Sequence, residues 1–470
     1  MGRRDKNVTN DRERGLNKKS HFRPGKSPAD LAAVVHAELR KRPSKVPPLS
    51  VLTALFECLY FASLKTEESE SIKIHVAYID PGNPDPSPPK RCCQDRWTHI
   101  PFKHPVTMTV SNLVKIAKAS DPRSSSFAVY ADEAGRLSVW GLIDQGNRYY
   151  EFINYESESG PDRPGIFQAS IEGIGHIVTY IGYDKLAELK VNTLVRNARD
   201  VLRGGPISDK LNTGILAYLN TVEKQLPQSL RESFPDWVAG LSDEWTSSIC
   251  RLLLRVQNYR HGGTILITED SSFFGLRIKH RIDYPRLSTA LARRALFRIQ
   301  GSKASDEIFE EHLDKDSEDI PIELYFDEVI NRGDYEDGNS EVEGAIWFIS
   351  LLTRVDGLVL MNPSLEVKGF GVEITFSDEP PSIFMARDRR AKNKHLRKLD
   401  YERFGTRHRS MMRYCSKIAD SVGFVISQDG DVRVMTQVRG KLVVWENLRL
   451  QLHDFIRRTK LPKKIVSEKE

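Results

Sequence analysis

The sequence lacks the features that mark secreted, membrane-spanning and zinc-ribbon proteins. Its five cysteines include no Cys-x-x-Cys pair, and their odd number argues against a disulfide framework. The longest apolar run, residues 51–64, has 14 residues, whereas a membrane-spanning helix needs about 20. We therefore expect a cytoplasmic protein without membrane association, in which residues 51–64 form a buried amphipathic helix.

Common enzyme signatures are also missing. The chain has no Gly-x-Ser-x-Gly nucleophile motif and no Walker-type phosphate loop. His261, His280 and His408 do not have the spacing of metal ligands. A serine hydrolase, a P-loop enzyme and a zinc enzyme are thus not indicated.

The body of the chain has little net charge. The whole sequence carries +6, and residues 1–28 contain nine Lys or Arg against three acids, which accounts for all of it. A basic surface that coats nucleic acid is therefore not favoured. We interpret residues 1–28 as a disordered solubilising tail. The alternative is a non-enzymatic scaffold with a basic tail that binds nucleic acid.

The hydrophobic pattern predicts an α/β protein. Residues 71–80, 126–143 and 165–182 are rich in β-branched and aromatic side chains, and the second stretch has the Gly-containing turn of a hairpin. Residues 261–269, HGGTILITE, are a short apolar run behind two glycines, which indicates a central strand covered on both faces. Residues 423–445 predict three consecutive strands.

We divide the chain into five parts. They are a disordered tail (1–28), an N-terminal α+β lobe (29–195), a helical connector (196–245), a second domain with a mixed central sheet flanked by helices (246–446), and a C-terminal helix and tail (447–470).

The most informative stretch is YERFGTRHRSMMRYC, residues 401–415. Gly405 and Thr406 read as a helix start, where the threonine can accept from first-turn amides. Helix N-termini favour anions, and the guanidinium groups of Arg407 and Arg409 suit phosphate oxygens. His408 adds a titratable donor. From these residues alone, the alternative is a surface salt-bridge network.

Four strings in this order resemble the diadenylate cyclase (DAC) family. They are GGTILIT (262–268), LLTRVDGLVL (351–360), GTRHRSMM (405–412) and VISQDGDV (425–432). The string GTRHR is the most specific of them. Alone, Asp356-Gly357 and Asp429-Gly430 would read as turns.

The upstream chain resembles a divergent DAC-like family of probable sensor proteins, the DACNV type. The stretches that carry this resemblance are residues 60–72, 97–122 and 127–146.

The DAC resemblance implies a nucleotide site and a homodimer. In that family two ATP-loaded domains face each other, and each ATP attacks the α-phosphate of the other with help from a divalent metal, Mg²⁺ or Mn²⁺. Asp356 would bind the metal and activate the hydroxyl, and Asp429 would be its acidic partner. The implied nucleotide-binding residues are Gly357, Leu358, Gly405, Thr406, Arg407, His408, Arg409 and Ser427.

The departures from the family pattern weaken the metal side. The family's Asp-Gly-Ala is Asp-Gly-Leu here, with Leu358 close to the nucleotide's path, and its Ser-Glu-Glu is Ser427-Gln428-Asp429. Gln428 brings no charge to a metal. We therefore predict a nucleotide-binding sensor that holds ATP or a related nucleotide and signals to an unknown downstream partner. The alternative is an active cyclase that makes cyclic di-AMP and pyrophosphate.

Two charged segments lie between the family motifs. Residues 303–343 are acidic and residues 387–398 are basic. We interpret both as inserted, exposed polar segments, the basic one as a helix or loop. A further hypothesis is that the basic segment grips phosphates.

Overall fold

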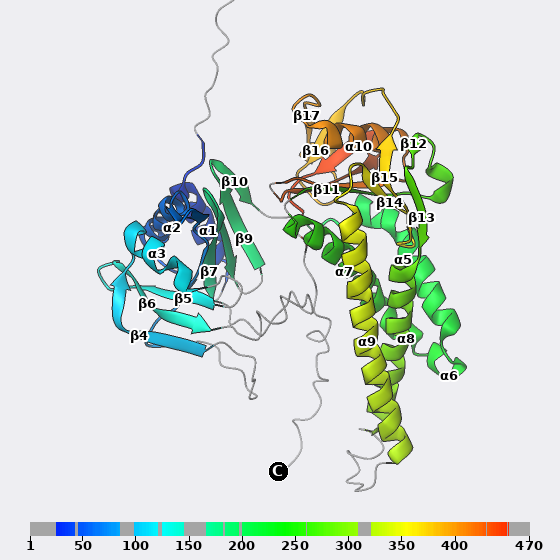
Figure 1. Ribbon diagram of the computed structural model, residues 1–470, viewed down its shortest axis with the longest axis horizontal. Coiled ribbons are helices and arrows are strands. Elements are labelled where there is room, and N and C mark those ends of the chain that lie inside the picture. The colour runs from blue at the N-terminus through cyan, green and yellow to red at the C-terminus, as the bar shows by residue number, and fades with distance from the viewer. Residues whose placement is uncertain are drawn as a thin grey trace, which may run out of the picture.

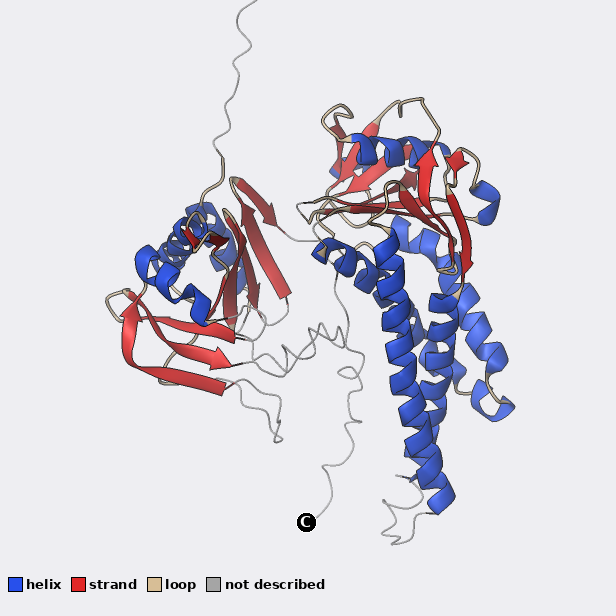
Figure 2. Cartoon of the chain, in the orientation of Figure 1, coloured by secondary structure: helices blue, strands red, loops and turns tan. Residues whose placement is uncertain are grey.

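The computed structural model describes residues 25–42, 46–84, 98–120, 125–144, 166–181, 184–196, 200–259, 261–308, 321–428, 430–448 and 450. The chain forms two α/β lobes, each built on its own sheet (Figures 1 and 2). Most of the predicted basic tail, Asp429 and the predicted C-terminal helix lie outside the described residues. Within the described ranges, no helix is long and apolar enough to cross a membrane.

The N-terminal lobe is an eight-stranded sheet with helices on one face (Figure 1). Its strand order is β10-β9-β8-β7-β3-β5-β6-β4. The helices are α1 (Pro28–Leu39), α2 (Leu49–Ser63) and α3 (Val110–Ile116). The strands are β3 (Ile74–Tyr78), β4 (Thr98–Thr107), β5 (Ser125–Ala131), β6 (Leu137–Asp144), β7 (Phe167–Gly173), β8 (His176–Ile181), β9 (Asp184–Lys190) and β10 (Thr193–Arg196), with a small β1 (Thr66–Glu67) and β2 (Glu70–Ser71) ribbon beside them.

Sequence features explain this lobe. The apolar run at 51–64 is helix α2, whose Leu52, Leu55 and Phe56 are fully buried against the sheet. The predicted hairpin is the antiparallel pair β5 and β6. Strand β4 contains two prolines and lies at the edge of the sheet, where a missing N–H breaks no ladder.

The second lobe contains a mixed sheet with helices on both faces, as predicted. Its order is β12-β15-β14-β11-β18-β19-β20-β16-β17, with β13 also paired to β15. The strands are β11 (Gly263–Ile267), β12 (Leu276–Arg277), β13 (His280–Tyr284), β14 (Leu358–Met361), β15 (Val367–Ile374), β16 (Ile383–Ala386), β17 (Leu396–Leu399), β18 (Val422–Ile426), β19 (Val432–Val438) and β20 (Lys441–Trp445). Strand β11 is central and buried at every residue.

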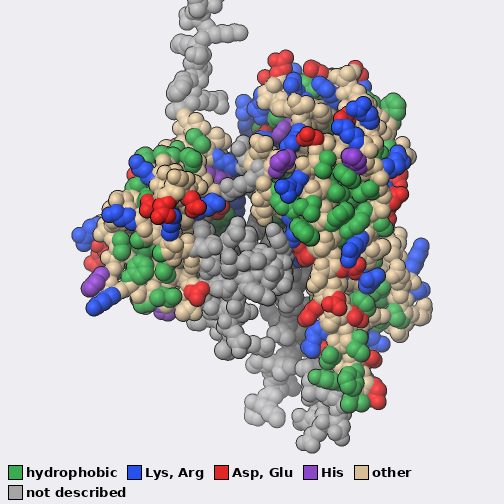
Figure 3. Space-filling model, viewed as in Figure 1, with side chains coloured by type: hydrophobic (Ala, Val, Ile, Leu, Met, Phe, Trp, Pro, Cys, Tyr) green, Lys and Arg blue, Asp and Glu red, His purple; other side chains and the backbone are tan. Residues whose placement is uncertain are grey.

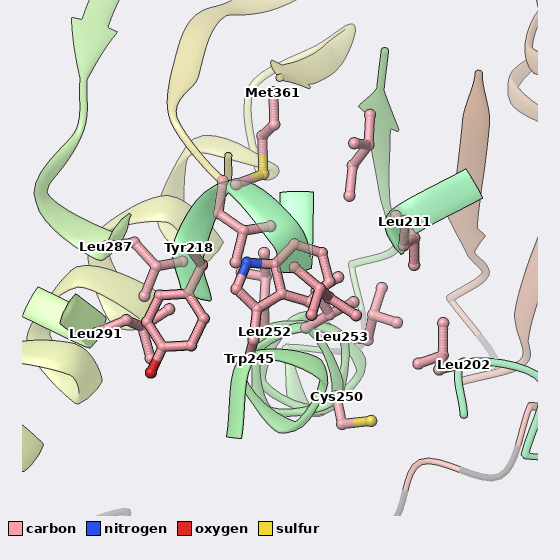
Figure 4. Close-up of a cluster of buried hydrophobic side chains, with 14 of the residues drawn as sticks. Leu202, Leu211, Tyr218, Trp245, Cys250, Leu252, Leu253, Leu287, Leu291 and Met361 are labelled. Carbon is pink, nitrogen blue, oxygen red and sulfur yellow. The ribbon is translucent and has the colours of Figure 1, made fainter. Parts of the chain in front are cut away.

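Helices make a separate core on each face of this sheet. The larger core involves α5 (Pro206–Gln225), α7 (Phe234–Asn258), α8 (Arg286–Glu307) and α9 (Ile322–Leu352), with α6 (Gln228–Arg231) beside them. Figure 4 shows Trp245 of α7 amid Leu211, Leu252 and Leu253. The helices that begin the predicted connector thus share one core with the sheet. Helix α10 (Thr406–Lys417) packs on the other face.

The two charged segments differ from their predicted conformations. The acidic residues from 322 onward lie in the single long helix α9, where Glu341 and Glu343 pair with arginines of α8 and α7. The complementary charges of these helices explain why this part is no loop. The basic segment is the connection of the β16–β17 hairpin, with a short 3-10 turn at Asn393–His395, and no α-helix.

Candidate functional site

Three of the four sequence motifs meet at one edge of the second sheet. Strands β11 and β14 are parallel, so the glycines before them, Gly262 and Gly357, stand at the same edge. Strand β18 is antiparallel to β11 and pairs Ile426 with Gly263, so Ser427 emerges there too. The Thr264 hydroxyl donates to the Gly357 carbonyl oxygen at 2.9 Å and ties two of these chain segments together.

Helix α10 brings the fourth motif to this edge. Arg407, in the first turn of α10, is exposed, and its Nη1 donates to the His261 carbonyl oxygen at 3.3 Å. Gly262 has a φ of +75°, and a Cβ there would lie 2.9 Å from Arg407 Nη1. Glycine is therefore required at this position both by the backbone conformation and by the approaching guanidinium.

The start of α10 offers backbone donors without a side-chain cap. The helix begins at Thr406, and Gly405 is the N-cap residue, with no side-chain cap hydrogen bond. The expectation that Thr406 caps the helix is therefore wrong, because Thr406 is already its first helical residue. Uncapped first-turn amides and an exposed arginine in the same turn favour an anion at this edge.

His408 differs from its two arginine neighbours. Its Nε2 lies 3.1 Å from Arg433 Nη1, and because arginine only donates, Nε2 accepts and Nδ1 carries the proton. Burial lowers the pKa of His408 to about 4, helped by the charges of Arg433 and Arg407 and opposed by Asp431. His408 is thus neutral at pH 7, and its Nδ1 N–H is the donor that it has left.

Arg409 is partly buried against an aromatic ring. Its Cζ lies 5.8 Å from the centre of the Tyr401 ring, whose hydroxyl accepts from Arg413 Nε at 2.8 Å. The ring holds the guanidinium beside the first turn of α10 by a cation–π contact. Of the three consecutive basic side chains, Arg407 is the most exposed.

The Asp356-Gly357-Leu358 segment enters the edge from the end of α9. Asp356 is exposed. Gly357 has a φ of +115°, and a Cβ there would lie 2.5 Å from the backbone of Gly371 on β15. Leu358 is only 4% exposed and packs in the α10-side core, so the structure places it under the edge, where the sequence interpretation had put it close to the nucleotide's path.

Ser427 is built into a tight turn. Its hydroxyl accepts from the Asp431 N–H at 3.0 Å, and its carbonyl accepts from the Gly430 N–H at 3.0 Å. Asp431 pairs with Lys190 of β9, from the N-terminal lobe, and lies 3.7 Å from Arg433 Nη2. The hydroxyl proton of Ser427 remains available to a ligand.

The described residues do not form a metal cage by themselves. In the described part of the chain, no three His, Cys, Asp or Glu side chains gather as metal ligands. Asp356 is the described carboxylate of the predicted pair, and Asp429 is not described. One carboxylate fits Mg²⁺ only when phosphate oxygens supply further ligands.

Sequence reasoning missed the polar groups behind the edge. Arg433 of β19 contacts His408, and Glu446 after β20 accepts from Arg433 Nε at 3.1 Å. The alternation in VRVMTQV places Arg433 on the same side of its strand as buried residues, which was the available signal. The pairing of Lys190 with Asp431 joins two lobes and left no local signal.

The basic connection between β16 and β17 also reaches this edge of the sheet. Strand β16 is parallel to β20 and ends at the edge where β20 ends. Arg389 packs on the loop before α5, where a Cβ on Gly204 would lie 3.1 Å from its Cζ. Phosphate gripping by this segment stays a prediction.

Comparison with known proteins places the N-terminal lobe. Residues 41–144 match the family described as probable sensor domain DACNV, the family expected from the sequence. The match runs from the end of α1 to the end of β6. No curated protein and no solved structure matches the chain. Residues 41–144 are therefore a probable sensor domain of the DACNV family.

Proposed function

We propose that this protein is a nucleotide-binding sensor whose second lobe holds ATP or a related nucleotide by its phosphates. The observation that supports the proposal is the convergence of four separate motifs, between residues 261 and 427, on one sheet edge. Arg407, the uncapped start of α10 and two glycines with positive φ make this edge suited to a polyphosphate.

Asp356 is the residue that would hold a divalent metal there. A bound Mg²⁺ or Mn²⁺ would neutralise phosphate charge. Catalysis of cyclic di-AMP formation needs more than binding, because the attacking hydroxyl must be activated. Gln428 in place of an acid favours binding over cyclisation, so the active cyclase remains the alternative.

A homodimer through the second lobes is part of the proposal. Helix α9 exposes Trp347 (52%) and Phe348 (39%) shortly before Asp356. Figure 3 shows hydrophobic side chains gathered on the second lobe. Exposed apolar patches commonly mark interaction sites. Trp347→Lys should convert a dimer to a monomer in size-exclusion chromatography with light scattering, and a wild-type monomer would refute this part.

The first experiment measures binding of ATP, with Mg²⁺, to the full chain by calorimetry. Arg407→Ala should weaken binding about 10- to 100-fold, the contribution of a hydrogen bond to a charged group. Arg439→Ala is the matched control, because Arg439 is exposed at the β19–β20 turn, at the opposite edge of the sheet. It should change nothing. Equal affinity in wild type and Arg407→Ala would reject the phosphate site.

Chromatography of the same mixtures separates a sensor from a cyclase. A binding protein returns intact ATP. Cyclic di-AMP that disappears in Asp356→Asn would instead establish the cyclase, with Gln428 compatible with catalysis.

A further inference from the structure

The N-terminal sheet carries buried polar side chains on the face away from α1, α2 and α3. Phe127 and Phe167 belong to the helix-side core. Because side chains alternate along a strand, their neighbours Ser126 and Gln168 point to the opposite face. Both are 0% exposed. Neither amide atom of Gln168 nor the hydroxyl of Ser126 has a hydrogen-bond partner among the described residues.

Such groups are rare in folded proteins. Buried polar side chains nearly always have a partner, since burying them without one opposes folding. Ser170, on the same face of β7, does have one, because its hydroxyl donates to Glu172 at 2.6 Å. Two fully buried side chains on one face, both unpartnered within the described part of the chain, indicate a partner that is not part of the fold.

The sheet register puts small side chains between these two groups. Gln168 of β7 pairs with Ala77 of β3, which pairs with Ala128 of β5, which pairs with Gly141 of β6. Ser126 stands two residues before Ala128 on the same face. Neighbouring strands lie about 4.8 Å apart, so the floor from Ala77 to Gly141 is roughly 10 Å wide.

Aromatic groups and a backbone carbonyl bound this floor. Trp140 packs in one cluster with Ala77 and Ala128, and its Nε1 donates to the Ile79 carbonyl at 2.9 Å. Tyr130 packs against the same cluster. At Gly141, a Cβ would lie 2.5 Å from the Ile100 carbonyl oxygen, so β4 closes that end.

The chemistry of these groups selects a flat, uncharged ligand. A glutamine amide offers a donor and an acceptor side by side, which matches the amino group and ring nitrogen of adenine. Aromatic side chains bind planar rings by stacking. None of the floor and wall groups named above is positively charged, so they do not suit a phosphate.

We propose that this face of the N-terminal sheet is a binding site for an adenine-type base, read by Gln168 and Ser126 over the floor of Ala77 and Ala128. Three of these residues lie within the probable sensor domain at 41–144. The site is separate from the phosphate site of the second lobe and does not rest on it. It would give the lobe a small-molecule ligand.

Adenosine is the probe, because it has the base and no phosphate. Calorimetry with the full chain should show saturable adenosine binding. Gln168→Leu should weaken it about tenfold to a hundredfold. Ala128→Leu, which fills the floor, should abolish it. Gln437→Leu, the same change in the second lobe where Gln437 donates to the Ser416 carbonyl oxygen, should leave it intact.

Thermal unfolding gives a second readout. Gln168→Leu removes two unpartnered polar atoms, so it should raise the unfolding temperature of the protein without adenosine. A structural role for the amide would lower that temperature and overturn the proposal. Absence of saturable adenosine binding would overturn it as well. Binding that survives Gln168→Leu but is lost in Arg407→Ala would assign the base to the second lobe and would also overturn the proposal.

Discussion

At the scale of single residues, the cluster Arg407, His408 and Arg409 divides into three roles. Arg407 is exposed at the sheet edge, His408 accepts from Arg433, and Arg409 packs on Tyr401. Adjacent residues on a helix start point about 100° apart, so a run of like charges does not make a uniform surface. The run indicates a phosphate site through Arg407 chiefly.

The buried environment of His408 predicts an acid-sensitive stability. Its pKa in the folded protein is about 4, below its ordinary value of 6.5. Between these values the unfolded chain takes up the proton more readily. The contribution is complete above about pH 6.5 and is lost as pH falls toward 4. His408→Gln keeps an acceptor for Arg433 and should lose less stability over this range in urea unfolding.

The control for His408 is another histidine replacement. His104 is exposed on β4, so His104→Gln should follow the wild type at every pH. If wild type and His408→Gln lose the same stability between about pH 6.5 and 4.5, His408 is not held neutral by its surroundings.

At the scale of elements, helix α9 contains glycines that its surroundings do not require. Gly344 is helical and exposed, and a Cβ there would meet nothing within 4 Å. Alanine in a helix interior is favoured over glycine by roughly 0.5–1 kcal/mol. Gly344→Ala should therefore raise the free energy of unfolding by about that amount.

Gly338 is the contrasting position on the same helix. A Cβ there would lie 3.2 Å from Arg294 Cβ of α8, a tight contact. Gly338→Ala should gain less stability than Gly344→Ala when both are measured in one denaturant series. A larger gain at Gly338 would show that the packing of α8 on α9 is looser than described.

Elements also show what the sequence could predict. Period-two patterns identified the β5–β6 hairpin, and an apolar run behind two glycines identified the central strand β11. Local patterns failed where the partner is distant in sequence. The acidic stretch became helix α9 because arginines of α7 and α8, such as Arg251 and Arg293, face it. The basic stretch became a hairpin connection because β16 pairs with β20.

The candidate site was predictable in part for the same reason. Motif order suggested that positions 262, 357, 407 and 427 belong together, and parallel pairing of β11 with β14 brings them to one edge. The unpartnered Gln168 was not predictable. Its sequence context, FQASIEG, reads as an ordinary alternating strand, and only the burial of that face makes its amide unusual.

At the scale of the whole molecule, the two lobes meet next to the candidate site. Lys190, at the end of β9, pairs with Asp431, whose N–H is bonded to Ser427 Oγ and whose carboxylate neighbours Arg433. Arg433 in turn contacts His408. A chain of polar contacts thus runs from the N-terminal lobe to the first turn of α10.

Reversing the charge of Lys190 tests this link. Lys190→Glu would face Asp431 with a second carboxylate, and repulsion should replace an attraction of up to about 1 kcal/mol. We expect a larger radius of gyration in small-angle X-ray scattering and a changed ATP affinity in calorimetry. The double variant Lys190→Glu with Asp431→Lys should restore both, because it exchanges the two charges. Lys185→Glu, on the same strand but paired with Glu188, controls for charge alone. If Lys190→Glu leaves both quantities at wild-type values, the ion pair does not couple the lobes, and a ligand of the N-terminal sheet would need another route to the second lobe.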